Sequence, residues 1–253
     1  LFGRRSLASG STTLLVVFGV QAGIFVVLFP FFQAVLGWSG LLSTLAMMPM
    51  AVLMMIASGL APRLTERFGA RSTTAAGILL AGTGSALMAA LVSVDGGYLS
   101  VLPGMLAMGV GMGLSMTPST EAITGSLPRE HQGVASALND VTREFGTALG
   151  VALLGALLSS GYRDAIDSRL AGVPHDTARE GVANAIAAAT GPGAQALVRA
   201  ARESFVDGWQ RAMWAGVAVM AALLLHVLVR GAGRRNAEGE ALAVRGDDEC
   251  AVP

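Results

Sequence analysis

A charged segment between two long apolar stretches carries the clearest chemistry in this sequence. The segment from Pro62 to Arg71 reads PRLTERFGAR. Its acid and the neighbouring arginines can form charge-assisted hydrogen bonds to the end of a facing helix, and its glycine permits a tight turn. We interpret four of its residues as a candidate conformational-switch loop: Glu66, Arg67, Gly69 and Arg71. The alternative is a loop whose arginines only set the orientation of the chain in a membrane.

Four polar residues occur close together in a second segment: Asn139, Asp140, Arg143 and Glu144. On a helix, Asn139 and Arg143 lie one turn apart on one face, and the two acids share the adjacent face. If the helix starts near Gly133, Arg143 lies about 15 Å from its end. An unpaired charge at that depth in a membrane is costly. Two interpretations stay open: the amide and guanidinium bond across helices, or the helix end projects into water with solvated charges.

A serine motif and three histidines raise the question of enzymatic chemistry. Residues 37–40 read GWSG, which matches the Gly-x-Ser-Gly pattern of intramembrane serine proteases. The only histidine expected in an apolar stretch is His226, and we place it at the opposite membrane face from Ser39, out of the reach that a general base needs. The histidines have no metal-ligand spacing, and the single cysteine, Cys250, excludes an intrachain disulfide. We therefore expect no enzyme and no cofactor.

Composition and charge distribution predict the elements that position these residues. The chain of 253 residues is 53% hydrophobic and 13% charged, with a mean hydropathy of +0.61. No charged residue occurs between Arg5 and Arg63 or between Arg211 and Arg230. An apolar stretch of about 17–25 residues crosses a bilayer as a helix, and lipid excludes strands with unpaired backbone groups. We predict an all-α integral membrane protein with six transmembrane helices: Thr12–Leu36, Leu41–Leu60, Ser72–Val94, Tyr98–Ser119, Gly133–Ser160 and Gly208–Val229.

The arginine distribution predicts the orientation of the chain in the cell (plasma) membrane. Arginines flank the N-terminus, the second and fourth loops and the end of the last helix, which places both termini in the cytoplasm. The predicted domains are a cytoplasmic flank (1–11), a six-helix transmembrane domain (12–230) and a cytoplasmic polar tail (231–253). The loop 161–207 then lies outside, although it carries five arginines. Helical patterning in three stretches of this loop predicts a small amphipathic subdomain: 163–170, 177–189 and 194–205.

Two further sets of residues have predicted roles inside the helices. Three Gly-x-x-x-Gly pairs allow helices to approach closely: Gly19/Gly23, Gly109/Gly113 and Gly146/Gly150. Gln21 and Gln33 are the polar residues of the first helix, and polar side chains in a bilayer tend to face the protein interior. They are candidates to line a substrate pathway, or they bond neighbouring helices.

The loop at residues 62–71 resembles a motif found between the second and third helices of each half of a major facilitator superfamily transporter, written G-x-x-x-D-R-x-G-R-R. Its acid, base, glycine and last base correspond to Glu66, Arg67, Gly69 and Arg71. Pro62 and Ala70 depart from the usual glycine and first base, as expected of the weaker copy in C-terminal halves.

A second resemblance is to the late-helix signature of the fourteen-helix drug–proton antiporters of this superfamily. It runs from Pro128 to Asn139 and continues through the stretches 143–146 and 149–152. Further matching positions are Gln33, Gly37, Ser39, Gly40 and Pro49. The resemblance implies that the chain is the C-terminal half of such a transporter, built as an inverted repeat of three plus three helices, and that the N-terminal half is missing.

The resemblance implies a bacterial secondary transporter that exports hydrophobic or cationic drugs by alternating access, driven by a proton gradient. The implied partners are membrane lipid, the missing N-terminal half and a small drug-like molecule. No basic run suggests nucleic acid. Proton coupling needs membrane-embedded carboxylates, which are expected mainly in the missing half because Asp140 and Glu144 are the only candidates here. The alternatives are an intramembrane serine protease and a non-transporting membrane scaffold.

Overall fold

The computed structural model describes residues 5–125, 132–170 and 176–249. Two residues named above, Pro128 and Cys250, lie outside the described part, as do two of the three histidines (His131 and His175) and two of the arginines that predict the orientation (Arg4 and Arg129). Six helical segments in the described part are long and apolar enough to cross a membrane, which confirms the predicted number of spans.

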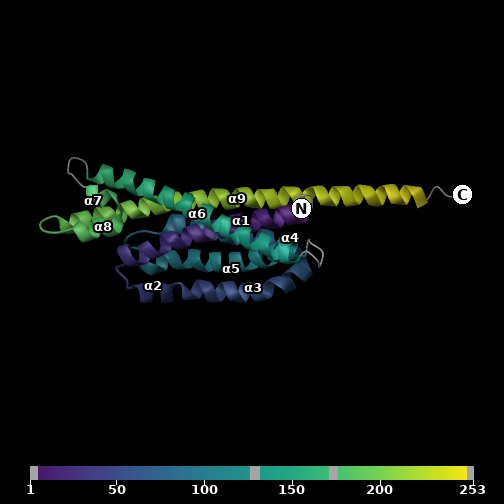
Figure 1. Cartoon of the computed structure of the whole chain (residues 1–253), viewed down its shortest axis with the longest axis horizontal. Helices are drawn as coiled ribbons and strands as arrows, with labels where there is room; N and C mark the ends of the chain where they lie inside the picture. Colours follow the sequence, from purple (N-terminus) through teal and green to yellow (C-terminus); the bar gives the residue numbers. More distant parts are fainter. Residues whose placement is uncertain (1–4, 126–131, 171–175, 250–253) are drawn as a thin grey trace.

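The helices follow one another with short connections. The first span is α1 (Arg5–Pro30), continued by a π-helix, η1 (Phe31–Val35). The second combines α2 (Gly40–Ala46) and α3 (Met48–Phe68). The other spans are α4 (Ala70–Leu91), α5 (Gly97–Thr124), α6 (Gln132–Arg169) and α9 (Ala194–Glu249), and two short helices precede α9: α7 (Asp176–Arg179) and α8 (Val182–Ala188). The long helices run along one axis, with α7 and α8 at one end (Figure 1). We call this the α7–α8 end and the opposite one the Gly69 end.

The long helices form two layers. Helices α3, α5, α1 and α6 pack side by side in that order as a row. In the second layer, α4 packs on α5, α9 packs on α6, and α4 and α9 pack on each other. The other face of the row, with α1 and α5 at its centre, is covered by no helix in the described part of the chain. We call it the open face.

Glycines bring the parallel helices α1 and α6 into backbone contact. A Cβ on Gly19 would lie 2.8 Å from the carbonyl oxygen of Gly146, and one on Gly23 would lie 2.7 Å from that of Gly150. Gly150 in turn packs on the backbone of Gly19. The contact advances by four residues on both helices, which is the spacing of Gly-x-x-x-Gly packing.

Helices α5 and α3 form an equivalent parallel pair. Cβ atoms on Gly109 and Gly113 would lie 2.5 Å from the carbonyl oxygens of Met50 and Met54, respectively. One turn further along, the hydroxyls of Ser58 and Thr117 are 2.8 Å apart. The pairing of the first span with the fifth therefore recurs between the fourth span and the second, as an inverted repeat of three plus three helices requires.

The predicted boundaries around the loop 161–207 were wrong. Helix α6 continues past Ser160 to Arg169, and α9 begins at Ala194 rather than at Gly208. Gly161 and Gly208 do not end helices. They are where the two helices cross, because a Cβ on Gly161 would lie 2.8 Å from the Cα of Gly208. About half of the predicted loop is therefore an extension of two spans, and α7 and α8 lie between the two extensions.

The helix boundaries also differ elsewhere. Helix α3 runs to Phe68 instead of Leu60, and α9 continues through the predicted polar tail to Glu249. Charged residues end the apolar stretch, but they do not end a helix, because water solvates them. In the first span, the α-helix gives way after Pro30 to a π-helix in which the amide of Leu36 donates to the carbonyl of Phe31 (3.1 Å). Proline lacks the amide hydrogen that a regular helix needs.

The glycine contact between α1 and α6 can be tested with two substitutions on the same helix. We expect Gly150→Ala to lower the free energy of unfolding by about 1–3 kcal/mol, because the methyl group meets the backbone of Gly19 and the helices must separate. Gly155→Ala is the control, since a Cβ there meets nothing within 4 Å. Alanine at this position should be neutral or slightly stabilising. Thermal unfolding in detergent measures both, and equal melting temperatures would contradict the prediction.

Candidate functional site

The predicted switch loop is a turn of a single residue between two spans. Gly69 separates α3 from α4 with a backbone φ of +87°, and its amide donates to the carbonyl oxygen of Thr65 (2.8 Å). Residues with a side chain rarely adopt such a φ, so the glycine is required by the backbone itself. The turn fixes the direction in which the charged residues on either side project.

Arg71 joins α4 to α9. Its Nε donates to the carbonyl oxygen of Val227 (3.2 Å), and its Nη2 donates to that of Leu228. The sequence suggested charge-assisted bonds from Glu66 and its arginine neighbours to a facing helix end. The partners of Arg71 are backbone carbonyls of α9 in the second layer, which ties α4 to α9 at the Gly69 end.

The other two charged residues of the loop, Glu66 and Arg67, form no ion pair in the part of the chain that the structure describes. The guanidinium of Arg67 lies over the ring of Phe68, 5.3 Å from its centroid. Glu66 is exposed and forms no ion pair with the described residues. An ion pair of Glu66 with a facing helix stays a prediction.

The polar residues of α6 are divided between two faces, as helical spacing predicts. Asn139 is 8% exposed, and its Oδ1 has no hydrogen-bond partner among the described residues. The guanidinium of Arg143 lies over the ring of Phe18 on α1, 4.4 Å from its centroid. Asp140 and Glu144 are exposed. Asn139 is therefore buried among the helices, the exposed Arg143 lies with its guanidinium on a ring of α1, and the two acids are exposed.

An aromatic stripe on α1 was missed in the sequence. Phe18, Phe25 and Phe29 are half-buried and recur at the spacing of one helix face, and the exposed Gln33 continues that face by one more turn. Fully buried residues of α1 and the glycines against α6 occupy its other faces. The stripe therefore borders the open face. A search for aromatic residues four and seven apart would have found it.

The two glutamines of α1 are not neighbours. Gln21 is half-buried, its Oε1 has no hydrogen-bond partner in the described part, and it lies twelve residues from Gln33. That separation is about 18 Å along a helix. They do not form one binding site, although each can contribute to a pathway along α1.

A cluster of rings closes the α7–α8 end of the row. Phe32 stacks on Trp38 with 5.7 Å between centroids, and Tyr98 lies 5.6 Å from Trp38 and donates to the carbonyl of Ala46 (2.7 Å). Beside this cluster, Arg202 of α9 donates from Nε to the carbonyl oxygen of Ala34 in η1 (3.1 Å). No local pattern could have revealed this bond, because 168 residues separate its partners.

The geometry does not support protease chemistry. Ser39 caps α2 at the α7–α8 end, where its Oγ accepts from the amide of Leu42 (3.3 Å). His226 adjoins Val227, whose carbonyl binds Arg71 at the Gly69 end. The intervening α3 has 21 residues, which is about 30 Å. In the described part of the chain, no group of acids, histidines and cysteine could hold a metal ion.

The fold and these residues define a class of protein. The chain is a multi-span helical membrane protein whose two triplets of spans are related as an inverted repeat, with charged residues concentrated at the helix ends. The profile of the Major Facilitator Superfamily matches residues 1–151. The chain belongs to this family, whose members are transporters and not enzymes.

Several bacterial proteins are similar to the chain. The multidrug efflux pump LfrA of Mycolicibacterium smegmatis is 31% identical over 198 residues, which is 76% of this chain and 38% of that protein. The multidrug resistance protein Stp of Mycobacterium tuberculosis is 27% identical over 89% of the chain and 44% of its own length. The tetracenomycin C resistance and export protein of Streptomyces glaucescens is 28% identical over 92% of the chain and 45% of its length. The chain thus spans less than half the length of these relatives.

Because Arg71 binds α9, we predict that substituting Arg71 destabilises the protein more than substituting Arg63 in the same loop. We expect Arg71→Gln to lower the free energy of unfolding by about 1–2 kcal/mol, because two hydrogen bonds from a charged donor are lost. Arg63→Gln should have little effect, since Arg63 is exposed. Denaturation in detergent compares them. Indistinguishable stabilities would show that the contact between α4 and α9 does not depend on Arg71.

Proposed function

We propose that this chain is the C-terminal half of a proton-coupled exporter of hydrophobic or cationic drug-like compounds in a bacterial cell membrane. One observation carries the proposal: the open face has α1 and α5 at its centre and is bordered by aromatic and amide side chains. Names of the relatives, which include an efflux pump and an export protein, support it. A second domain placed on the open face would enclose a cavity between the halves.

The stripe on α1 suits such compounds. Phenylalanine faces bind apolar rings and attract cations, and an amide such as that of Gln33 adds one directional hydrogen bond. Binding that depends on stacking tolerates many ligands, because it requires little fixed hydrogen-bond geometry. The stripe therefore favours a broad range of flat or cationic molecules.

Arg143 and Asn139 are proposed to act in the change between inward-facing and outward-facing states. Arg143 has an aromatic ring as its partner instead of a carboxylate, so it can leave Phe18 without breaking an ion pair. The Oδ1 of Asn139 can then accept a hydrogen bond that this arrangement does not give it. Both residues lie on α6, which packs against α1 and moves with it.

Proton coupling is assigned to the other half of the transporter. Among the described residues, the buried polar side chains are hydroxyls and one amide, and none is an acid. A coupling carboxylate must change its surroundings between the two states to change its affinity for a proton. Asp140 and Glu144 are exposed here, and they are therefore poor candidates.

The proposed orientation places both termini and the Gly69 end in the cytoplasm. The loop arginines there obey the positive-inside rule, and the proposed role of Glu66 and Arg67 is to bind the other half in one of the two states. The α7–α8 end then lies outside.

The role of Arg143 can be tested by efflux of a fluorescent cationic dye from cells that express the complete transporter. We expect Arg143→Ala to abolish efflux and Arg143→Lys to restore only part of it, because lysine lacks the planar guanidinium that covers a ring. The control is Arg163→Gln, because Arg163 is an exposed arginine on the same helix. Normal efflux by Arg143→Ala at equal membrane levels would exclude the proposed role. If neither the wild type nor any variant exported the dye, a non-transporting scaffold would be favoured.

The orientation can be tested with single cysteines at exposed positions. We expect Ser39→Cys to react with a membrane-impermeant maleimide added to intact cells, because Ser39 lies at the α7–α8 end. Ala70→Cys, beside the switch loop, should react only after the membrane is opened. The reverse labelling pattern would overturn the proposed orientation without affecting the fold.

A further inference from the structure

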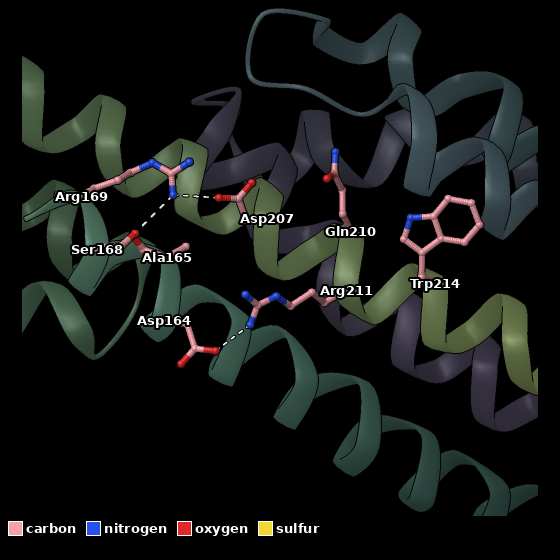
Figure 2. A pocket seen from close by; sticks show the side chains of 8 residues that line it. All are labelled: Asp164, Ala165, Ser168, Arg169, Asp207, Gln210, Arg211 and Trp214. Carbon is pink, nitrogen blue, oxygen red and sulfur yellow. Dashed lines mark hydrogen bonds and ion pairs between the residues drawn. The ribbon is translucent and has the colours of Figure 1, made fainter.

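A polar groove lies between α6 and α9 at the α7–α8 end, away from the open face. Its volume is about 960 Å³. It is lined on α6 by Asp164, Ser168 and Arg169, and on α9 by Asp207, Arg211 and Trp214 (Figure 2). None of these residues has a role in the transport cycle proposed above.

The groove includes the point where the two helices cross. Gly161 and Gly208 allow the backbones to touch, and the aliphatic part of Arg211 lies against Gly161, since a Cβ there would be 3.0 Å from its Cδ. The groove extends to both sides of this crossing. Toward α7 and α8 it is lined by Asp164, Ser168 and Arg169 of α6 and by Asp207 of α9, and in the opposite direction by Arg211 and Trp214 of α9.

The groove lies where the apolar part of both helices ends. On α9 no charged residue occurs between Arg211 and Arg230, and on α6 none occurs between Glu144 and Arg163. Trp214 lies one turn inside this apolar part and is 52% exposed. Tryptophan is enriched at the boundary between hydrocarbon and headgroups. The charges of the groove are therefore at headgroup level, and its Trp214 side is at the level of the upper acyl chains.

Charges of opposite sign face each other across the groove and alternate along it. Arg211 Nη1 lies 2.6 Å from Asp164 Oδ2, and Arg169 Nη1 lies 2.8 Å from Asp207 Oδ2 (Figure 2). These four side chains sum to zero charge and are partly exposed. A ligand with a single charge would meet as many like charges as unlike ones. A ligand that carries both signs a few ångströms apart can pair with both.

We propose that this groove binds the headgroup of a phospholipid that carries a phosphate and a primary ammonium, as phosphatidylethanolamine does. Guanidinium groups bind phosphate through two parallel hydrogen bonds, which suits Arg169 and Arg211. The ammonium has three N–H donors for the carboxylates of Asp164 and Asp207. A choline headgroup has no N–H donor, so it cannot form these bonds. The acyl chains would leave the groove beside Trp214.

A simpler explanation is that the two ion pairs only join α6 to α9. Ser168 distinguishes the two explanations, because it lines the groove and its Oγ donates only within its own helix, to the carbonyl of Ala165 (2.8 Å). Ser168→Phe fills the groove and leaves both ion pairs in place. It should abolish lipid recognition if the groove is a binding site, and it should change nothing if the pairs only join the helices.

The experiment measures lipid binding to the complete transporter by native mass spectrometry. Phosphatidylethanolamine, phosphatidylcholine and phosphatidylglycerol with identical acyl chains are added to delipidated protein in detergent. We expect the wild type to prefer phosphatidylethanolamine over phosphatidylcholine by about tenfold, which is the effect of losing one good charged hydrogen bond. Ser168→Phe and the double variant Asp164→Asn/Arg211→Gln should each reduce this preference to nearly one.

The control removes an ion pair of the same kind outside the groove. Arg179 and Asp167 form a pair at 2.8 Å between α7 and α6, and Asp167→Asn/Arg179→Gln should keep the tenfold preference. Equal binding of the three lipids to the wild type would overturn the proposal, as would a preference that survives in Ser168→Phe. Stronger binding of phosphatidylglycerol than of phosphatidylethanolamine would also overturn it, since recognition would then depend on the arginines alone. If either groove variant fails to fold, the other one decides the test.

Discussion

Backbone contact at glycine residues fixes the two central helices of this domain. In a bilayer the hydrophobic effect does not draw one helix to another, so a pair of spans depends on how closely the backbones fit. Gly19 and Gly150 hold α1 against α6, and Gly109 and Gly113 hold α5 against α3. Each central helix is thereby fixed to an outer helix of the row, and the inverted repeat places the two contacts symmetrically. The open face exists because both contacts lie within the row and leave its surface uncovered.

Helix α9 connects the two ends of the domain through arginine bonds to backbone carbonyls. At the Gly69 end, Arg71 of α4 donates to carbonyls of α9, and at the α7–α8 end Arg202 of α9 donates to Ala34 in η1. A carbonyl is an acceptor that any residue provides, so these bonds constrain position without requiring a matching acid. The carbonyl of Ala34 is in a π-helix that begins after Pro30. The second layer therefore holds the irregular end of the central helix α1.

The number of spans and the class of fold could be predicted from the sequence, because both follow from where charges are absent. The turn at Gly69 was also predicted, and its backbone φ of +87° is one that glycine adopts readily. Boundaries failed at Ser160 and Gly208 because charge and glycine mark the limit of the apolar layer, which is not the end of a helix. Contacts such as that of Arg202 with Ala34 could not be predicted. They depend on how distant segments pack, and nothing in the local pattern of either residue indicates its partner.

Two buried amide oxygens suggest why this arrangement can change. The Oδ1 of Asn139 and the Oε1 of Gln21 are enclosed without a hydrogen-bond partner in the described part of the chain. A buried acceptor left in this condition costs about 1–3 kcal/mol. These residues lie on α6 and α1, the pair that glycines hold together. The missing hydrogen bonds therefore destabilise this pair of helices in the row. A second arrangement that satisfies either oxygen would gain that free energy. The proposed alternating access requires two states of similar stability, and incomplete hydrogen bonding in one state reduces the difference in free energy between the two.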